Sequence, residues 1–190
     1  MGKEVVHEIR DNFKKFEEIF TKDKIINKNF ITLEEKESNK DWLYGNSPTQ
    51  IDTNLNDIFF IVEKKKLDKK YGIKYRSESF YKKPYFRFDS DGPAHRNYVD
   101  NLPIEQQMIT TPHFNTYNKD GIPIAYKNEI LKDDAKAKII ADDINFGISV
   151  FCQETNSKAK DIDYPEIVVN EAIFEFDYEA MINLDHLNFE

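Results

Sequence analysis

The stretch that decides the fold reads PYFRFDSDGP and occupies residues 84–93. Its first six residues alternate between aromatic and polar side chains, and this period of two is typical of a β-strand with one buried face. Ser90, Asp91, Gly92 and Pro93 follow as a turn signal, because these residue types favour turn geometry or bond to the nearby backbone. The stretch therefore predicts a strand that ends in a turn.

Further strands are predicted on both sides of this one. Upstream, the short apolar run at residues 57–62 is typical of a buried strand, and residues 71–80 alternate more loosely. Downstream, strands are predicted at 107–117 and 122–126, and the residues NKDG at 118–121 form a good hairpin turn between them. Because hairpins join antiparallel neighbours, we expect a mostly antiparallel sheet of about five or six strands.

Helices are predicted at both ends of this run of strands. Apolar residues recur at three- and four-residue spacing in 5–20, as in an amphipathic helix, and again from about 133 to 151. Residues 21–56 are weakly patterned, and the turn-like segment after Trp42 predicts an ordered loop. The end of the chain, 166–190, favours a strand by its alternation, with a helix as the alternative. The expected fold class is α+β, with the N-terminal helix and the late helix packed on one side of the sheet.

Length and composition predict one compact domain over residues 1–190, in a cytoplasmic protein with no membrane partner. Charged residues make up 33% of the chain and 25 residues are Phe or Tyr, which argues against both a membrane protein and a disordered chain. No apolar run approaches the ~20 residues of a spanning helix, and no signal peptide is recognisable. The single cysteine, Cys152, excludes an intramolecular disulfide framework, and its apolar surroundings predict a buried structural thiol.

Positive charge is concentrated between Lys64 and Arg87, where ten basic residues stand against two acidic ones although the whole chain carries −8. Aromatic residues lie among these lysines, and the combination suits phosphate contact and base stacking. An alternative is a lysine-rich strand edge that discourages aggregation. We predict that RNA or DNA binds here through nine residues: Lys64, Lys65, Lys66, Lys69, Lys70, Lys74, Tyr75, Arg76 and Arg96.

Negative charge is concentrated in an acidic extension, residues 161–190, which holds nine acidic residues and no lysine or arginine. Such a segment can attract a basic protein partner, for instance by mimicking nucleic acid. It can also cover the basic stretch, within one chain or across a homodimer. These alternatives stay open at the level of the sequence.

A second group of polar residues follows the strand at 84–89, and it could carry chemistry. Arg87, Asp89 and His95 lie close together in the sequence, and His113 follows eighteen residues after His95. If the two strands are neighbours, one histidine could remove a proton, the other could supply one, and the arginine could offset phosphoryl charge. The predicted catalytic residues are therefore Arg87, Asp89, His95 and His113.

Two other interpretations of this group remain. Asp and Asn beside Gly and Pro often bond to their own backbone in turns, and Arg87 with Asp89 can form a structural ion pair. A metal site could use Asp89, Asp91, His95 and His113, but their spacing matches no established ligand pattern. We therefore expect neither a metal nor a cofactor; glycine-rich phosphate loops and nicotinamide fingerprints are also absent from the sequence.

The same region resembles an uncharacterised bacterial family of domain-of-unknown-function proteins. The resemblance covers about residues 57–155 and depends on the pattern R-x-D-x-x-G-P-x-H-x-N from Arg87 to Asn97, then P-H-x-N at 112–115 and Ala-Tyr at 125–126. Family members have P-H-x-H, so this chain departs from the pattern at Asn115. Because members occur near toxin–antitoxin and phage-defence genes, the resemblance implies a bacterial or phage conflict system, and it implies no mechanism.

Two functions follow as expectations. The first is a nucleic-acid- or protein-binding factor of such a conflict system, in defence, counter-defence or toxin–antitoxin pairing. The alternative is a toxin-like ribonuclease or nucleotide-processing enzyme that uses the paired histidines. A structure separates the two through the histidines, which must converge at an accessible cleft if the second is correct.

Overall fold

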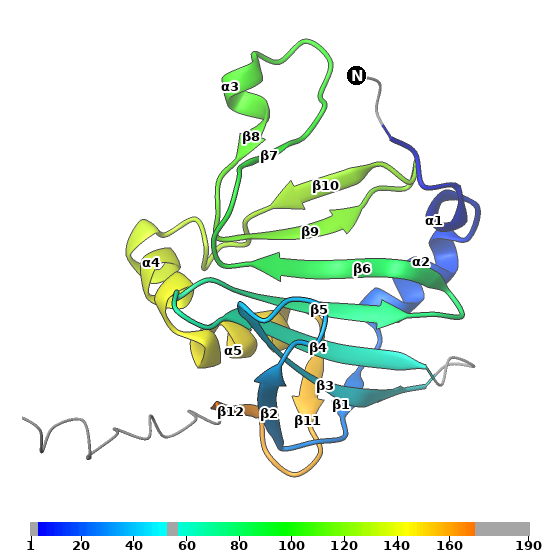
Figure 1. Ribbon diagram of the computed structural model, residues 1–190. Coiled ribbons are helices and arrows are strands. Elements are labelled where there is room, and N and C mark those ends of the chain that lie inside the picture. Colours follow the sequence, from blue (N-terminus) through cyan, green and yellow to red (C-terminus); the bar gives the residue numbers. More distant parts are fainter. Residues whose placement is uncertain (1–3, 53–56, 170–190) are drawn as a thin grey trace, which may run out of the picture.

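The computed structural model describes residues 4–52 and 57–169 and has an α+β fold (Figure 1). The helices are α1 (His7–Asp11), α2 (Phe13–Thr21), α3 (Ile104–Gln107), α4 (Asp134–Asp142) and α5 (Ile144–Glu154). The strands are β1 (Lys24–Ile26), β2 (Phe30–Glu35), β3 (Trp42–Ile51), β4 (Ile58–Lys65), β5 (Tyr71–Ser77), β6 (Tyr81–Asp89), β7 (His95–Arg96), β8 (Met108–Ile109), β9 (His113–Tyr117), β10 (Pro123–Tyr126), β11 (Ser157–Ala159) and β12 (Glu166–Val169).

Most strands belong to one sheet of ten strands, larger than the five or six expected. Its main path runs β10-β9-β6-β5-β4-β3-β1-β11, while β2 pairs with β3 and with β12. The pairing is antiparallel apart from β1 with β11 and β2 with β12. The long central strands follow one another in the chain, so the hairpin signals of the sequence predicted this part correctly.

One face of the sheet forms the hydrophobic core, and both α2 and α5 pack on it. Phe86 of β6 lies between them, with its ring centroid 4.9 Å from that of Phe20 at the end of α2 and 5.3 Å from that of Phe151 in α5. Phe88 and Phe114 continue the same layer and have no exposed surface. The polar residues that alternate with these aromatics must project from the other face.

Both predicted helices are interrupted by a polar residue. At Asn12, between α1 and α2, the side-chain amide donates to the carbonyl of Glu8 and competes with the helical backbone bonds. At Asp143, between α4 and α5, the carboxylate accepts from the backbone N–H groups of Asn145 and Phe146. Asp143 therefore begins α5 as an N-cap, and the chain turns there.

The prediction of a loop after Trp42 is wrong, because residues 42–51 form β3, one of the longest strands. Its turn-like residues have another role. A Cβ atom at Gly45 would lie 2.7 Å from the carbonyl oxygen of Thr32 in β2, so only glycine permits this close approach. β1, β2 and β3 account for most of the additional strands.

The predicted strand at 107–117 is divided into β8 and β9. Pro112 lies between them and has no N–H to donate to a strand ladder. Among the described strands, β8 pairs only with β7, and this short hairpin with its connecting segment and α3 projects beyond β10 at the top of the sheet in Figure 1. We call residues 95–109 the arm.

The structure bears on two further predictions, the absence of a membrane-spanning helix and a strand near the end of the chain. No helix within the described ranges is long and apolar enough to cross a membrane. The strand expected in 166–190 begins as β12, which pairs in parallel with β2. The acidic extension beyond Val169 lies outside the described residues.

Candidate functional site

Four polar side chains meet on the outer face of the sheet where β6 and β9 pair. Arg87 lies opposite Asn115, and Asp89 lies opposite His113. Directly opposed residues of an antiparallel pair project from the same face. Because Phe88 and Phe114 between them point into the core, these four residues face away from α2 and α5.

The carboxylate of Asp89 is the centre of this group. Its Oδ2 atom forms an ion pair with Arg87 Nη2 at 2.8 Å and accepts a hydrogen bond from Asn115 Nδ2 at 2.8 Å. His113 Nε2 lies 3.7 Å from the same oxygen. Asp89 therefore orients a guanidinium, an amide and an imidazole through one oxygen atom.

The second histidine reaches the site from the arm. His95 is the first residue of β7, and its ring centroid lies 6.4 Å from that of His113. Asn97 fixes this position, because its side chain donates to the carbonyl of Ala125 at 2.7 Å and accepts from the N–H of Ala125 at 2.8 Å. Ala125 belongs to β10 and lies opposite Asn115. The two bonds attach the arm to the sheet beside the site.

These side chains line an open cleft of about 290 Å³. Arg87, His95 and His113 contribute to its wall, and Lys70 also lines it. Gly92 lies under Lys70, and a Cβ atom there would approach Lys70 Nζ to 3.3 Å. With a φ of 148°, Gly92 also has a backbone conformation that favours glycine. The motif glycine therefore allows a lysine ammonium to approach the cleft.

The histidines differ in exposure but share the direction of their pKa shifts. Burial lowers the pKa of His113, which is 2% exposed, and Asp89 offsets part of this effect. Burial also lowers the pKa of the partly buried His95; the Pro123 backbone opposes this shift, and Arg87 adds to it. Burial therefore favours the neutral form of both imidazoles in the free protein.

The arrangement has the parts needed for proton transfer at an anionic substrate. A neutral imidazole such as that of His95 can accept a proton. The carboxylate of Asp89 lies beside the imidazole of His113 and stabilises its protonated form. Arg87 and Lys70 supply positive charge at the same cleft. Within residues 4–52 and 57–169, no group of three or more potential ligands is arranged to hold a metal ion. The four residues predicted as catalytic are thus brought together.

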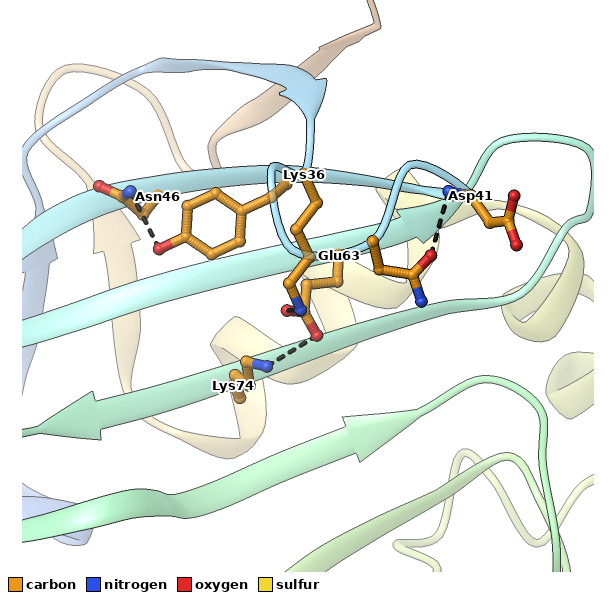
Figure 2. Close-up of polar contacts among 7 residues, drawn as sticks. Lys36, Asp41, Asn46, Glu63 and Lys74 are labelled. Carbon is orange, nitrogen blue, oxygen red and sulfur yellow. Dashed lines mark hydrogen bonds and ion pairs between the residues drawn. The ribbon is translucent and has the colours of Figure 1, made fainter.

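Most of the predicted nucleic-acid-binding cations are engaged within the fold. Glu63 accepts from Lys36 and Lys74, each at 2.7 Å, on the outer face of the sheet (Figure 2). Four further members of the group form ion pairs: Lys65 with Asp68, Lys66 with Glu35, Lys69 with Asp142 and Arg76 with Glu78.

Three cations of the group remain outside these ion pairs. Lys64 Nζ donates to two backbone carbonyls, and Arg96 donates to Gln107 and lies over the ring of Tyr98. Lys70 makes no ion pair with any acidic residue in the described part of the chain. Of the predicted group, Lys70 and not the whole basic stretch is available at the cleft.

The tyrosines of the basic stretch are buried and not available for base stacking. Tyr75 has no exposed surface, and its hydroxyl donates to Ser157 Oγ at 2.8 Å. Tyr71 and Tyr85 are 2% and 1% exposed. The prediction that Tyr75 contacts nucleic acid is therefore wrong: the alternation of β5 directs its two tyrosines inward and directs Lys74 and Arg76 outward.

Two asparagines of the site were absent from the predicted catalytic set. Asn97 positions His95, and Asn115 bonds to Asp89. Both stand in the motif that carried the family resemblance, so their spacing from the histidines was the available signal. Their bonding partners could not be found without the register of β6, β9 and β10.

Cys152 is confirmed as a buried thiol. It has no exposed surface, and burial raises its pKa to about 12. A thiol of this kind is protonated at neutral pH and is a poor nucleophile. The histidine cleft therefore remains the candidate site.

Comparisons with known proteins do not extend this description. No family model, curated protein or solved structure matches the chain.

Proposed function

We propose that this chain is a ribonuclease-type enzyme that cleaves phosphodiester bonds with His95 and His113. The observation that carries the proposal is the convergence of both imidazoles with Arg87 in one open cleft, with their ring centroids 6.4 Å apart. Acid–base cleavage of a phosphodiester needs one proton-transfer group on each side of the phosphate, and two neighbouring imidazoles at one cleft support that arrangement. The expectation of a ribonuclease or nucleotide-processing enzyme thus has the stronger geometric support.

In the proposed reaction, the phosphodiester lies between the two imidazoles and against the guanidinium of Arg87. His95 accepts the proton of the ribose 2′-hydroxyl as the 2′-oxygen attacks phosphorus. The bond from phosphorus to the 5′-oxygen breaks, and protonated His113 donates its proton to the leaving oxygen. The products are a 2′,3′-cyclic phosphate and a free 5′-hydroxyl.

The two histidines are assigned by their surroundings. Asp89 Oδ2 lies 3.7 Å from His113 Nε2 and stabilises an imidazolium there, so His113 is the acid. His95 is more accessible, and Asp89 is the smallest of the influences on its pKa, whereas for His113 Asp89 is the largest influence after burial; His95 is therefore the base. A bound phosphodiester anion favours protonation of either imidazole and offsets the effect of burial.

A binding factor of a conflict system stays a prediction with less support. This function was predicted from a basic surface with aromatic residues. Most cations of the predicted nucleic-acid-binding group form ion pairs within the chain, and Tyr75 belongs to the core. A basic protein partner for the acidic extension involves mainly residues outside the described ranges. Neither idea has a specific contact in its favour.

The test is cleavage of a short fluorogenic RNA in the presence of a metal chelator. We expect His95→Gln and His113→Gln each to lower the rate by about 100-fold or more, the usual contribution of a general acid or base. A glutamine side chain cannot transfer a proton at neutral pH, but it is polar and similar in size to histidine. His7→Gln is the matched control, because His7 is exposed on α1.

Thermal unfolding of each variant separates loss of chemistry from loss of structure. Folded His95 and His113 variants that cleave as fast as the wild type would overturn the proposal. So would a wild-type protein that cleaves none of a set of RNA sequences between pH 5 and 8.

A further inference from the structure

A second and larger hollow opens directly beside the histidine cleft. It has a volume of about 540 Å³, and its lining residues belong to α4, to the segments that follow β6, β8 and β10, and to residues 68–70 before β5. Lys70, Asp91 and Thr111 line both depressions, so the two adjoin. Pockets of several hundred cubic ångströms are typical of small-ligand sites.

The charges around this hollow differ from those of a phosphate site. Four lysines and four aspartates line it, so its formal charge is balanced. Lys69 is paired with Asp142 at 3.2 Å, and Asp68 is paired with Lys65 at 3.6 Å. A second phosphate would meet as many carboxylates as ammonium groups there. An uncharged ligand with both donors and acceptors fits this wall better.

Its uncharged residues support the same conclusion. Ser90, Thr110 and Thr111 supply hydroxyl groups, while Pro112 and Ala141 supply apolar surface. The carboxylate of Asp91, at the junction with the cleft, can accept hydrogen bonds from ribose hydroxyls, a pairing used in nucleotide-binding proteins. Sugar hydroxyls would then lie near the junction, and the base would lie against α4.

We propose that this hollow binds the nucleoside of the substrate whose phosphate occupies the histidine cleft. The inference rests on the proposed function and deepens it, since it assigns the substrate to nucleoside phosphates and their esters. Phosphate and nucleoside are covalently adjacent in such a molecule, as the cleft and the hollow are adjacent in the protein. Lys70 lies at the boundary and contacts the phosphate from the side of the nucleoside.

The experiment is calorimetric titration of the full chain with adenosine 3′-monophosphate, inorganic phosphate and adenosine. We expect the nucleotide to bind at least about tenfold more tightly than phosphate, the effect of two added hydrogen bonds of ordinary net strength. Ala141→Phe fills the hollow and should reduce nucleotide affinity to that of phosphate while phosphate affinity is unchanged. Ala135→Phe is the matched control, because Ala135 is exposed on the same helix and does not line the hollow.

Each outcome bears on the hollow separately from the chemistry. Equal affinity for nucleotide and phosphate, or an Ala141→Phe variant that leaves nucleotide affinity unchanged, would overturn the subsite even if RNA is cleaved. Adenosine binding that the Ala141→Phe substitution abolishes would support the subsite even if the wild-type protein does not cleave RNA. If Ala141→Phe does not fold, Asp91→Ala replaces it, and it should lose the nucleotide's advantage over phosphate.

Discussion

Asp89 is the residue on which the geometry of the cleft depends, because one of its oxygens forms an ion pair with Arg87, accepts a hydrogen bond from Asn115 and lies beside His113. Its negative charge opposes the effect of burial on the pKa of His113. Its ion pair also limits how much positive charge Arg87 presents to a substrate. Asp89 thus weakens the attraction of Arg87 for an anion, and it favours the protonated form of His113.

This balance gives a prediction about pH. Asp89→Asn removes the charge that raises the pKa of His113, so the pKa should fall further below 6.5. Fewer molecules then hold the proton that His113 donates, and the alkaline limb of the pH–rate profile should move to lower pH. NMR titration of the imidazoles and the pH dependence of kcat measure the two effects.

The control for this variant is Asp120→Asn, in the β9–β10 turn, which removes a charge outside the cleft. An Asp89→Asn protein with an unshifted pH–rate profile would contradict the assigned role of His113. The kcat/KM of the wild type reports the free enzyme and should be greatest below pH 6.5, since burial lowers the pKa of both histidines there.

The residue types of the site were readable from the sequence, whereas their partners were not. Arg87, Asp89 and His95 are near neighbours in the chain, so the prediction that they lie close in space required only that the strand and the turn be recognised. The pairing of Lys74 with Glu63 or Lys66 with Glu35 depends on which strands are adjacent. A local count of charges therefore overestimated the positive surface.

At the scale of elements, the arm determines whether the site is complete. It brings His95 to the cleft, and the paired hydrogen bonds of Asn97 to Ala125 attach it to β10. β7 itself is only two residues long and pairs only with β8. Because so short a hairpin has little stability alone, we infer that Asn97 positions His95.

We therefore predict that Asn97→Ala lowers kcat nearly as much as His95→Gln does, although Asn97 does not line the cleft. Two buried backbone groups lose their partners, so unfolding should require about 1–3 kcal/mol less. With the arm detached, His95 becomes more exposed and its pKa should rise towards 6.5, which NMR titration detects.

Gln106→Ala is the control, because Gln106 is exposed in the same arm. A purely structural role for Asn97 predicts a different result: lower stability with kcat and the pKa of His95 unchanged. That combination would remove Asn97 from the site.

The elements themselves were predicted with uneven success, and the reason is physical. β4, β5 and β6 follow one another, and their alternation and turns are local features. In β3, Gly45 and Pro48 resemble turn residues, yet Pro48 lies opposite Phe59 in the sheet and Gly45 makes room for β2. Tertiary contacts override local preference there, and a single sequence does not display those contacts.

At the scale of the molecule, the early and late parts of the chain are joined beneath the sheet by one buried lysine. Lys24 is 1% exposed, and its ammonium donates to the carbonyls of Phe20, Lys22 and Thr155 at 2.8–2.9 Å. These carbonyls lie at the C-terminal ends of α2 and α5, where the helix dipole favours positive charge. The strand that begins at Lys24, β1, pairs in parallel with β11 directly after α5.

Burial lowers the pKa of Lys24 to about 7 from its usual 10.5, and Asp23 offsets a small part of this shift. Between pH 7 and 10.5 the unfolded chain therefore binds a proton that the folded protein releases. Stability contributed by Lys24 must rise with pH across that window, by up to about 1.4 kcal/mol per unit, and must be constant below it.

We predict that Lys24→Met destabilises the protein more at pH 9 than at pH 7, as measured by urea unfolding. Three carbonyls, of which that of Thr155 is buried, lose their donor at either pH, at a cost of about 1–3 kcal/mol, whereas the wild type gains stability only above pH 7. Lys158→Met, exposed on the paired strand β11, is the control. An equal difference from the wild type at both pH values would mean that Lys24 keeps its proton in the fold, and that the two helix ends hold an ammonium ion by dipole and hydrogen bonds alone.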